Sequence, residues 1–236
     1  TGAKAGLCDG DPRTLMLYAE MARRMIRENN QAIMVVHYGG AVADVEPLKW
    51  LADLHGIALI EDAAQSLGAK AGGNHAGTTG IFGAVSFHDT KIVGCGHGGA
   101  LLCNTDDPAL LAKVEQILDR GTDFADKAAG RVPFYQWVSQ GSSFRLPELQ
   151  AAVLCAQLER LETVIARRLD ISRLYASRLS LTRYPWTLLD GNAKDGSNGH
   201  IFALLAQSPE GAARLMANAA KQGIQLESHY APLHLS

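Results

Sequence analysis

The chain has 236 residues, of which 47% are hydrophobic and 19% are charged, so a sizeable buried core is expected and a disordered chain is not. The net charge of -2 argues against general nucleic-acid binding, which needs a basic face. No apolar run has the length of a membrane span, there is no signal peptide, and the four cysteines form no CxxC pair or disulfide framework, so we expect a protein of the reducing cytoplasm with no membrane partner.

In chain order, the first half of the sequence alternates between helix and strand patterns. Residues 12–30 read as a helix with a basic end, and "AIMVV" at 32–36 is a continuous apolar run of strand length. A second helix is expected between Asp44, a plausible N-cap, and Gly56, which ends it. Further strands are predicted at 57–62, 83–88 and 99–104, and an amphipathic helix at 107–121.

The second half begins with one long helical pattern at 146–180, of a kind that often links two domains. A strand is predicted at 200–206, a helix at 209–223 and a final strand at 224–230. We therefore predict an α/β protein with a mostly parallel sheet sandwiched by helices in residues 1–145, and a smaller C-terminal α+β domain after the linking helix, within 146–236. Since the chain begins at Thr1 without a methionine and stops at "HYAPLHLS", we expect both ends to be truncated.

Polar residues follow the predicted strands at the edge of the sheet where open parallel sheets bind ligands. Because the carboxyl ends of these strands meet at one edge, we expect their side chains to converge. The residues are His37 and Tyr38 after the first strand, Asp62 and Gln65 after the second, and Ser86, His88 and Lys91 at the end of the third.

A lysine and an aspartate at the same strand edge indicate pyridoxal 5'-phosphate as the cofactor. Lys91 would form a Schiff base with the cofactor aldehyde. Asp62 would pair with the protonated pyridine nitrogen and keep the ring an electron sink, and Ser86 would bind the phosphate. The glycines at 94, 96, 98 and 99 would let the loop turn tightly and pass close to a flat cofactor.

Each of these residues also has an ordinary structural interpretation. A single lysine is most often a solvated surface residue, and Asp62 in "DAAQ" has the pattern of a helix N-cap. A glycine run is a weak phosphate signature and often marks a turn. The spacing of these residues along the chain therefore supports an active site and the ordinary structural interpretations about equally.

Five segments follow one another in a more specific order: "AIMVVHYGG", "DLHGIALIEDAAQSLGA", "GTTGIFGAVSFHDTKIVGCGHGGALL", "GSSFRLPELQAAVLCAQLERLE" and "ESHYAPLH". Together they resemble the DegT/DnrJ/EryC1/StrS family of sugar-nucleotide aminotransferases, a branch of the fold-type-I pyridoxal phosphate enzymes, from about residue 30 to the end. The "SFHDTK", "GSSFRLPELQAA" and "HYAPLH" forms are most similar to the dTDP-4-amino-4,6-dideoxygalactose transaminase subgroup.

The resemblance implies a homodimer that transfers the amino group of glutamate to a nucleotide-linked 4-keto-6-deoxy sugar. The sugar would be dTDP-4-keto-6-deoxy-D-glucose, and the product would serve polysaccharide biosynthesis, such as that of enterobacterial common antigen or lipopolysaccharide. No metal is implied.

The resemblance also assigns roles to residues that match the family's motifs. Lys91 would be the catalytic residue, which binds the cofactor and carries the proton in both half-reactions. The cofactor-binding residues would be Asp62 at the pyridine nitrogen, Gln65 at the ring hydroxyl, Ser86 at the phosphate, and Ser143 at the phosphate of the partner subunit's site. The substrate-binding residues would be His88, His200 and Tyr230.

Three departures from the family pattern keep an alternative open. Ile92 stands where the family usually has asparagine, His97 where its glycine loop has an acid, and residues 123–124 where the subgroup has Asn-Arg. Ile92, His97 and the expected loss of the amino-terminal part favour a diverged or truncated homologue that binds a sugar nucleotide or a partner chain without turnover. A sugar dehydratase of the same family is disfavoured by Lys91, because those relatives tend to have histidine there. A nucleotide-binding α/β module without the cofactor is disfavoured by the joint presence of "EDAAQ" and "SFHDTK".

Overall fold

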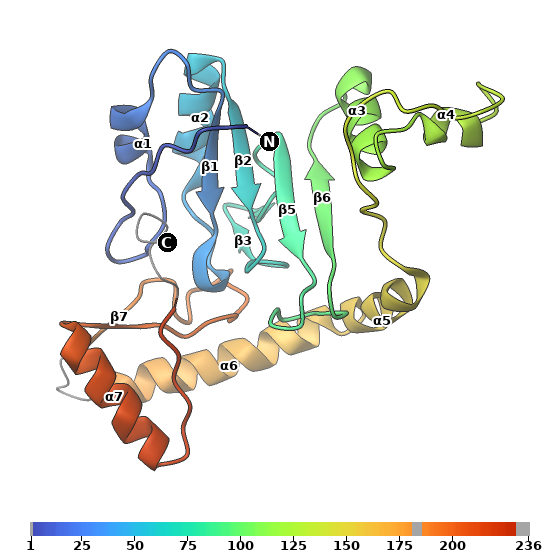
Figure 1. Ribbon diagram of the computed structural model, residues 1–236. Coiled ribbons are helices and arrows are strands. Elements are labelled where there is room, and N and C mark those ends of the chain that lie inside the picture. Colours follow the sequence, from blue (N-terminus) through green and yellow to red (C-terminus); the bar gives the residue numbers. More distant parts are fainter. Residues whose placement is uncertain (1, 181–185, 230–236) are drawn as a thin grey trace.

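The computed structural model of the protein describes residues 2–180 and 186–229. Its centre is a four-stranded sheet in the order β1 (Ala32–Val36), β2 (Ala58–Asp62), β5 (Phe82–Ser86) and β6 (Gly99–Cys103). β1, β2 and β5 are parallel, and β6 runs antiparallel to β5 (Figure 1). The predicted mostly parallel sheet is confirmed, and its four strands match the predicted ranges to within two residues.

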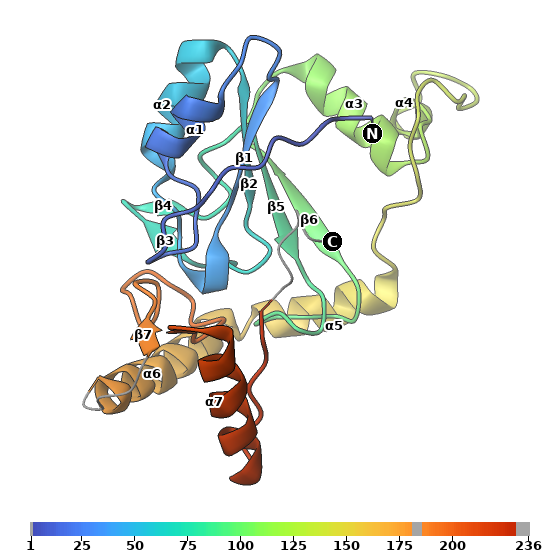
Figure 2. The same ribbon diagram turned by 60° about the vertical axis from the view of Figure 1, so that its left-hand side comes forward.

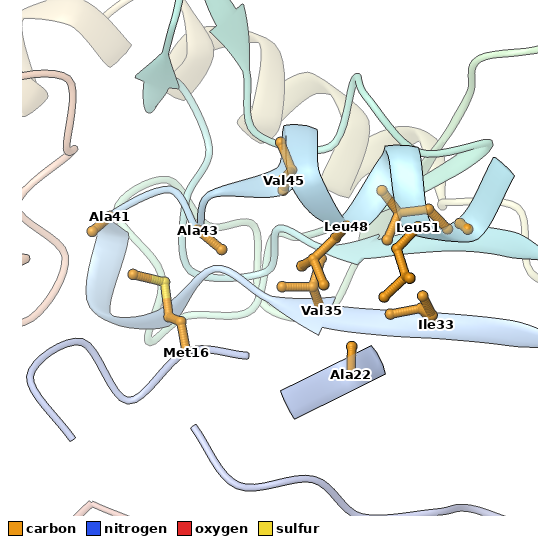
Figure 3. Close-up of a cluster of buried hydrophobic side chains, with 11 residues drawn as sticks. Met16, Ala22, Ile33, Val35, Ala41, Ala43, Val45, Leu48 and Leu51 are labelled. Atoms are coloured by element: carbon orange, nitrogen blue, oxygen red, sulfur yellow. The ribbon is translucent and has the colours of Figure 1, made fainter. Parts of the chain in front are cut away.

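Two helices, α1 (Ala19–Met25) and α2 (Val45–His55), cover one face of this sheet. Ile33 and Val35 of β1 point toward Leu48 and Leu51 of α2, and none of the four is more than 7% exposed (Figure 3). Burying such side chains contributes about 1.5–3 kcal/mol each. α2 ends as predicted at Gly56, whose φ of 62° lies in the left-handed region that favours glycine.

The opposite face of the sheet is more open. Burial alternates strictly along β1, and Met34 and Val36 are 62% and 42% exposed. Val36 pairs with Asp62, which pairs with Ala84 of β5, and Ser86 lies two residues further on the same face. The open face therefore carries two of the predicted cofactor-binding residues.

Most of the remaining elements lie near the edge at which the parallel strands end, whereas the two helices that follow the antiparallel β6 lie at the opposite end of the sheet (Figure 1). A long helical segment, α5 followed by α6, runs beneath that edge, and α7 lies beyond it from the sheet (Figures 1 and 2). These elements are η1 (Tyr38–Gly40), the hairpin β3 (Lys70–Ala71) and β4 (Asn74–His75), α3 (Pro108–Leu118), α4 (Phe124–Ala128), α5 (Glu148–Leu158), α6 (Leu161–Leu179), the pair β7 (Trp186–Leu188) and β8 (Leu204–Ala206), and α7 (Pro209–Lys221). None of the helices within the described ranges combines the length and apolarity that crossing a bilayer requires.

Four predicted elements differ from the observed ones. The helix at 12–30 shrinks to α1, because Leu15 has a φ of 59° that no helix accommodates. The helical run at 146–180 is two helices, interrupted at Arg160, whose ψ is 0°. The strand at 200–206 shrinks to β8, because the amide of Ile201 donates instead to the carbonyl of Gly39 at 3.0 Å. No strand forms over 224–229, where the amide of Ile224 closes the end of α7; the predicted Tyr230 lies outside the described residues.

Candidate active site

Lys91 lies partly buried in the loop between β5 and β6, at the edge where the parallel strands end. Its amide donates to the carbonyl of His88 at 2.9 Å. The next two residues, Ile92 and Val93, are 8% and 1% exposed and share a hydrophobic cluster with Leu154 of α5. Ile92 is therefore a core residue that anchors the loop directly after Lys91.

The glycines of this loop allow the chain to fold back on itself. The amide of Phe87 donates to the carbonyl of Gly98 at 2.8 Å. A Cβ atom at Gly94 would lie 2.9 Å from the carbonyl oxygen of His88, and Gly96 has a φ of +92°. The loop backbone thus requires glycine for its own packing. That the same glycines make room for a cofactor stays a prediction.

Asp62 and Ser86 face the open side of the sheet on neighbouring strands. The carboxylate of Asp62 accepts a hydrogen bond from the amide of Ala64 at 2.9 Å, so it caps a turn. The alternative prediction of a helix N-cap is wrong, because no helix follows Asp62. Ala84, the strand partner of Asp62, is exposed and lies two residues before Ser86, on the same face of β5. A carboxylate, a small exposed side chain and a hydroxyl in this order fit a flat ring that carries a cationic nitrogen and a phosphate.

Gln65 and Ser66 hold the chain that follows β1. The Gln65 side-chain oxygen accepts from the amide of Gly39 at 2.7 Å, which leaves the amide nitrogen of Gln65 as its donor. The buried hydroxyl of Ser66 donates to the carbonyls of His37 and Ala41, at 2.8 and 3.2 Å. Segment 37–41 is therefore placed by groups that follow β2.

A fully buried pair, His37 and Glu61, lies behind this edge, and sequence reasoning did not single out Glu61. His37 Nε2 lies 2.8 Å from the Glu61 carboxylate. Since His37 Nδ1 accepts from the amide of Ala43 at 3.1 Å, the network assigns the proton to Nε2 and makes the ring a donor to Glu61.

The Glu61 carboxylate also accepts the amides of Gly77, Thr79 and Gly80. Burial raises the pKa of Glu61, but the hydrogen bonds from His37 and from these amides outweigh it and leave the pKa below its ordinary value. Glu61 is thus an ionised anchor that joins the ends of β1 and β2 to the loop at 77–80.

Asn198, which the sequence did not single out either, joins the C-terminal part of the chain to the strand edge. It is 0% exposed, and its amide group donates to the carbonyls of Gln65 and Leu67 at 3.0 Å each. Its side-chain oxygen accepts from the amide of His200 at 2.9 Å. A Cβ atom at Gly40 would clash with that oxygen, so glycine is required where the two segments meet.

His200, the predicted substrate-binding histidine, lies within electrostatic range of Lys91. Its pKa is lowered from 6.5 to about 4, first by burial and then by the positive charges of Lys91 and Arg168 and by His229. Its Nδ1 atom is buried and has no hydrogen-bond partner within the described part of the chain.

His229, the neighbour of Tyr230, also reaches this cluster. The Tyr38 hydroxyl lies 2.7 Å from His229 Nδ1. The pKa of His229 is lowered by burial and by the charge of Lys91. The sequence signal was present in "ESHYAPLH", but it pointed to the tyrosine rather than to this histidine.

His88 and Ser143 have different surroundings. His88 Nδ1 lies 3.2 Å from the Thr90 amide, and its ring packs edge-on against His97, with ring centroids 5.1 Å apart. Ser143 lies in the segment between α4 and α5, where it forms an isolated bridge with Asp119 at the end of α3. Within residues 2–180 and 186–229, no hydrogen bond joins Ser143 to Lys91, and the predicted role of Ser143 in a partner's site stays a prediction.

A family model for the DegT/DnrJ/EryC1/StrS aminotransferase family matches residues 1–236. Similar solved structures include the aminotransferase TlmJ from Streptoalloteichus hindustanus, with 26% identity, coverage of 97% of this chain and 60% of that chain, and a TM-score of 0.85. A DegT DnrJ EryC1 StrS aminotransferase from Brucella abortus is 30% identical over 97% of this chain and 59% of its own, with a TM-score of 0.80. DesV from S. venezuelae is 30% identical over 95% of this chain and 57% of its own, with a TM-score of 0.81. This chain thus spans about 60% of the length of these relatives, and their likeness confirms the predicted pyridoxal-phosphate transferase fold of type I.

Proposed function

This chain belongs to the DegT/DnrJ/EryC1/StrS aminotransferase family, and on that premise we propose that its protein is a pyridoxal-phosphate-dependent sugar aminotransferase. The observation that carries the proposal is the placement of Lys91. It lies partly buried at the strand edge that Asp62 and Ser86 also border, and its charge lowers the pKa of His200. DesV, one of the 30% identical relatives, was solved in complex with a ketimine intermediate.

Pyridoxal phosphate, when bound, supplies an aldehyde that exchanges amino groups and a ring that accepts electrons. Lys91 Nζ would hold the cofactor and then take and return the proton in each half-reaction. The Asp62 carboxylate would bind the ring nitrogen, the Ser86 hydroxyl the phosphate, and the free amide nitrogen of Gln65 the ring hydroxyl. Neutral His200 would orient the sugar without repelling the Lys91 cation.

In the balanced reaction that we propose, glutamate and a nucleotide-linked 4-keto-6-deoxy sugar give 2-oxoglutarate and a 4-amino sugar. The "SFHDTK" and "HYAPLH" forms favour dTDP-4-keto-6-deoxy-D-glucose as the sugar and dTDP-4-amino-4,6-dideoxygalactose as the product, used for surface glycans. His88 and Tyr230 are the further sugar contacts that the family motifs suggest. We propose the cytoplasm, where nucleotide sugars are made, as the location.

We propose that residues 1–145 act as the cofactor-binding domain and 146–236 as the linking helices and the small domain, since α5 begins at Glu148. We also propose a homodimer in which Ser143 reaches the partner's phosphate. Large apolar side chains gather in the sequence around Ser143 and are 51–85% exposed: Phe134, Trp137, Phe144, Leu149 and Val153. Sedimentation should show a dimer that Leu149→Glu weakens and Leu54→Glu, on α2, does not; a monomer loaded with cofactor would disprove the dimer.

The visible spectrum of the intact protein with pyridoxal phosphate, before and after glutamate, tests the proposed activity. We expect a visible band that bleaches with glutamate in the wild type and in Lys113→Ala, a control at an exposed lysine of α3. The band should be absent in Lys91→Ala. A band that Lys91→Ala leaves unchanged, or no band at all, would instead support a homologue that binds without turnover.

A further inference from the structure

An arm at residues 119–145 projects from the body of the molecule between α3 and α5 (Figure 1). The backbone ties its two sides together near the base. The amide of Arg120 donates to the carbonyl of Ser142 at 2.9 Å, and the amide of Ser139 donates to the carbonyl of Gly121 at 3.0 Å. A Cβ atom at Gly121, where φ is +77°, would clash with the carbonyl oxygen of Ser139, so this close approach requires glycine.

Ser143 lies at the base of the arm, directly beside the end of α3. It forms an isolated bridge with Asp119, the residue that ends α3. The amide of the next residue, Phe144, donates to the carbonyl of Leu118 at 3.1 Å. Ser143 itself is exposed. The end of α3 therefore holds the backbone around Ser143 and leaves this residue accessible from outside the molecule.

A buried carboxylate lies beside Ser143 and is bound by an arginine of the same segment. The side chain of Asp119 is only 7% exposed. Arg145, two residues after Ser143, donates to it twice, from Nε to Oδ1 at 2.6 Å and from Nη2 to Oδ2 at 2.5 Å. We call these two parallel hydrogen bonds the fork. Such bidentate pairs fix the plane of the guanidinium group as well as its distance from the carboxylate.

The stability of α3 does not explain why an acid stands at position 119. Asp107, at the start of α3, accepts hydrogen bonds from amides of the first turn, as a helix favours. Asp119 stands at the opposite end, where the negative pole of the helix dipole disfavours a carboxylate. A buried acid in this position needs a counter-charge, and Arg145 supplies it. What the pair gains is a fixed connection between the end of α3 and the segment that contains Ser143.

We propose that Asp119 and Arg145 are positioning residues for Ser143, and that their fork holds this serine where it would bind the cofactor phosphate of a partner's site. The proposal rests on the proposed function, which gives Ser143 that role. Neither Asp119 nor Arg145 has to touch the cofactor. A serine that is already ordered before the cofactor arrives loses less conformational freedom on binding, so the fork strengthens the phosphate contact. Lysine at 145 would keep the charge but could not form the fork.

Hydrogen exchange of the intact protein without cofactor tests the positioning directly. In Arg145→Gln, the amides of Ser142 and Phe144 should exchange at least about tenfold faster, because the charged hydrogen bonds that hold this segment are lost. Asp119→Asn should act in the same direction. Arg131→Gln is the matched control, since it breaks another arginine–aspartate pair of the arm, with Asp126 at 2.6 Å, and should leave both amides within about twofold.

A titration with pyridoxal phosphate, followed by its visible band, tests the consequence for the cofactor. Ser143→Ala and Arg145→Gln should each raise the Kd about tenfold, whereas Arg131→Gln should not. The double variant Ser143→Ala/Arg145→Gln should bind within about twofold of the weaker single variant, because Arg145 acts through Ser143. Sedimentation should show Arg145→Gln as a dimer, so that lost assembly does not account for the lost affinity.

The outcomes separate this proposal from the proposed function. Unchanged exchange in Arg145→Gln, additive losses in the double variant, or a monomeric Arg145→Gln would overturn the positioning role and leave the amino transfer intact. No cofactor band in the wild type would overturn the amino transfer, whereas the exchange experiment needs no cofactor and decides independently whether the fork holds the segment of Ser143.

Discussion

Replacing Asn198 with alanine should detach the C-terminal segment from the strand edge. The change removes three side-chain hydrogen bonds of 2.9–3.0 Å, to the carbonyls of Gln65 and Leu67 and from the amide of His200. Each is worth about 0.5–1.5 kcal/mol, and the backbone groups left behind are buried or partly buried. We therefore expect a loss of about 2–4 kcal/mol in the free energy of unfolding, a large share of the stability of a typical domain.

Urea unfolding followed by far-ultraviolet circular dichroism measures this loss, with Asn74→Ala as the matched control. Asn74 lies exposed on the β3–β4 hairpin, and its side-chain amide donates to Glu46 at 3.1 Å, so the loss for Asn74→Ala should stay within about 0.5 kcal/mol. A local readout accompanies the global one. The His200 pKa should rise from about 4 toward 6.5 by NMR titration as the ring leaves its buried position near Lys91. A loss below about 1 kcal/mol with an unchanged His200 pKa would refute the role of Asn198.

Three further predictions follow from the same cluster. Because the pKa of His200 is lowered in the folded protein, the unfolded state takes up the proton of this ring before the folded state does as the pH falls. The free energy of unfolding should therefore fall between pH 6.5 and 4, by roughly 1–2 kcal/mol after allowance for the partly exposed ring. His200→Gln should abolish this loss, which urea unfolding at a series of pH values measures. The pKa of Glu61 is also lowered, so its contribution is present above about pH 4.5 and is lost in more acidic solution. Glu61→Gln should lower the free energy of unfolding by about 2–4 kcal/mol at pH 7. It should also remove the part of the stability loss below about pH 4.5 that comes from protonation of Glu61, and an unchanged loss in that range would argue against an ionised carboxylate. Gly40→Ala should cost at least about 2 kcal/mol more than Gly72→Ala, because both glycines have positive φ but only Gly40 would press a Cβ atom against Asn198; thermal unfolding of the pair tests this.

Local patterns were sufficient for the central sheet and for the family. The apolar run at 32–36 became β1 residue for residue, and Gly56 ended α2, because strand burial and a left-handed helix end depend on the nearest residues. The joint motifs around Asp62 and Lys91 led to the correct family, since family motifs record chemistry directly in the residue types. The predictions at 12–30 and 200–206 were wrong because they relied on local periodicity alone. The positive φ of Leu15 shortened the first element, and the tertiary hydrogen bond of Ile201 shortened the second.

The amino-acid sequence by itself determined the four strands of the central sheet, the end of α2 at Gly56 and the family of this protein. Only the tertiary structure decided which polar groups meet. Lys91 and His200 are 200 − 91 = 109 residues apart, and no local pattern reports that Asn198 ties the second to the edge that carries the first. The buried roles of Glu61 and His37 were equally absent from the spacing. The physical reason is that hydrogen bonds and charges act over a few ångströms in space, and the fold alone sets those distances.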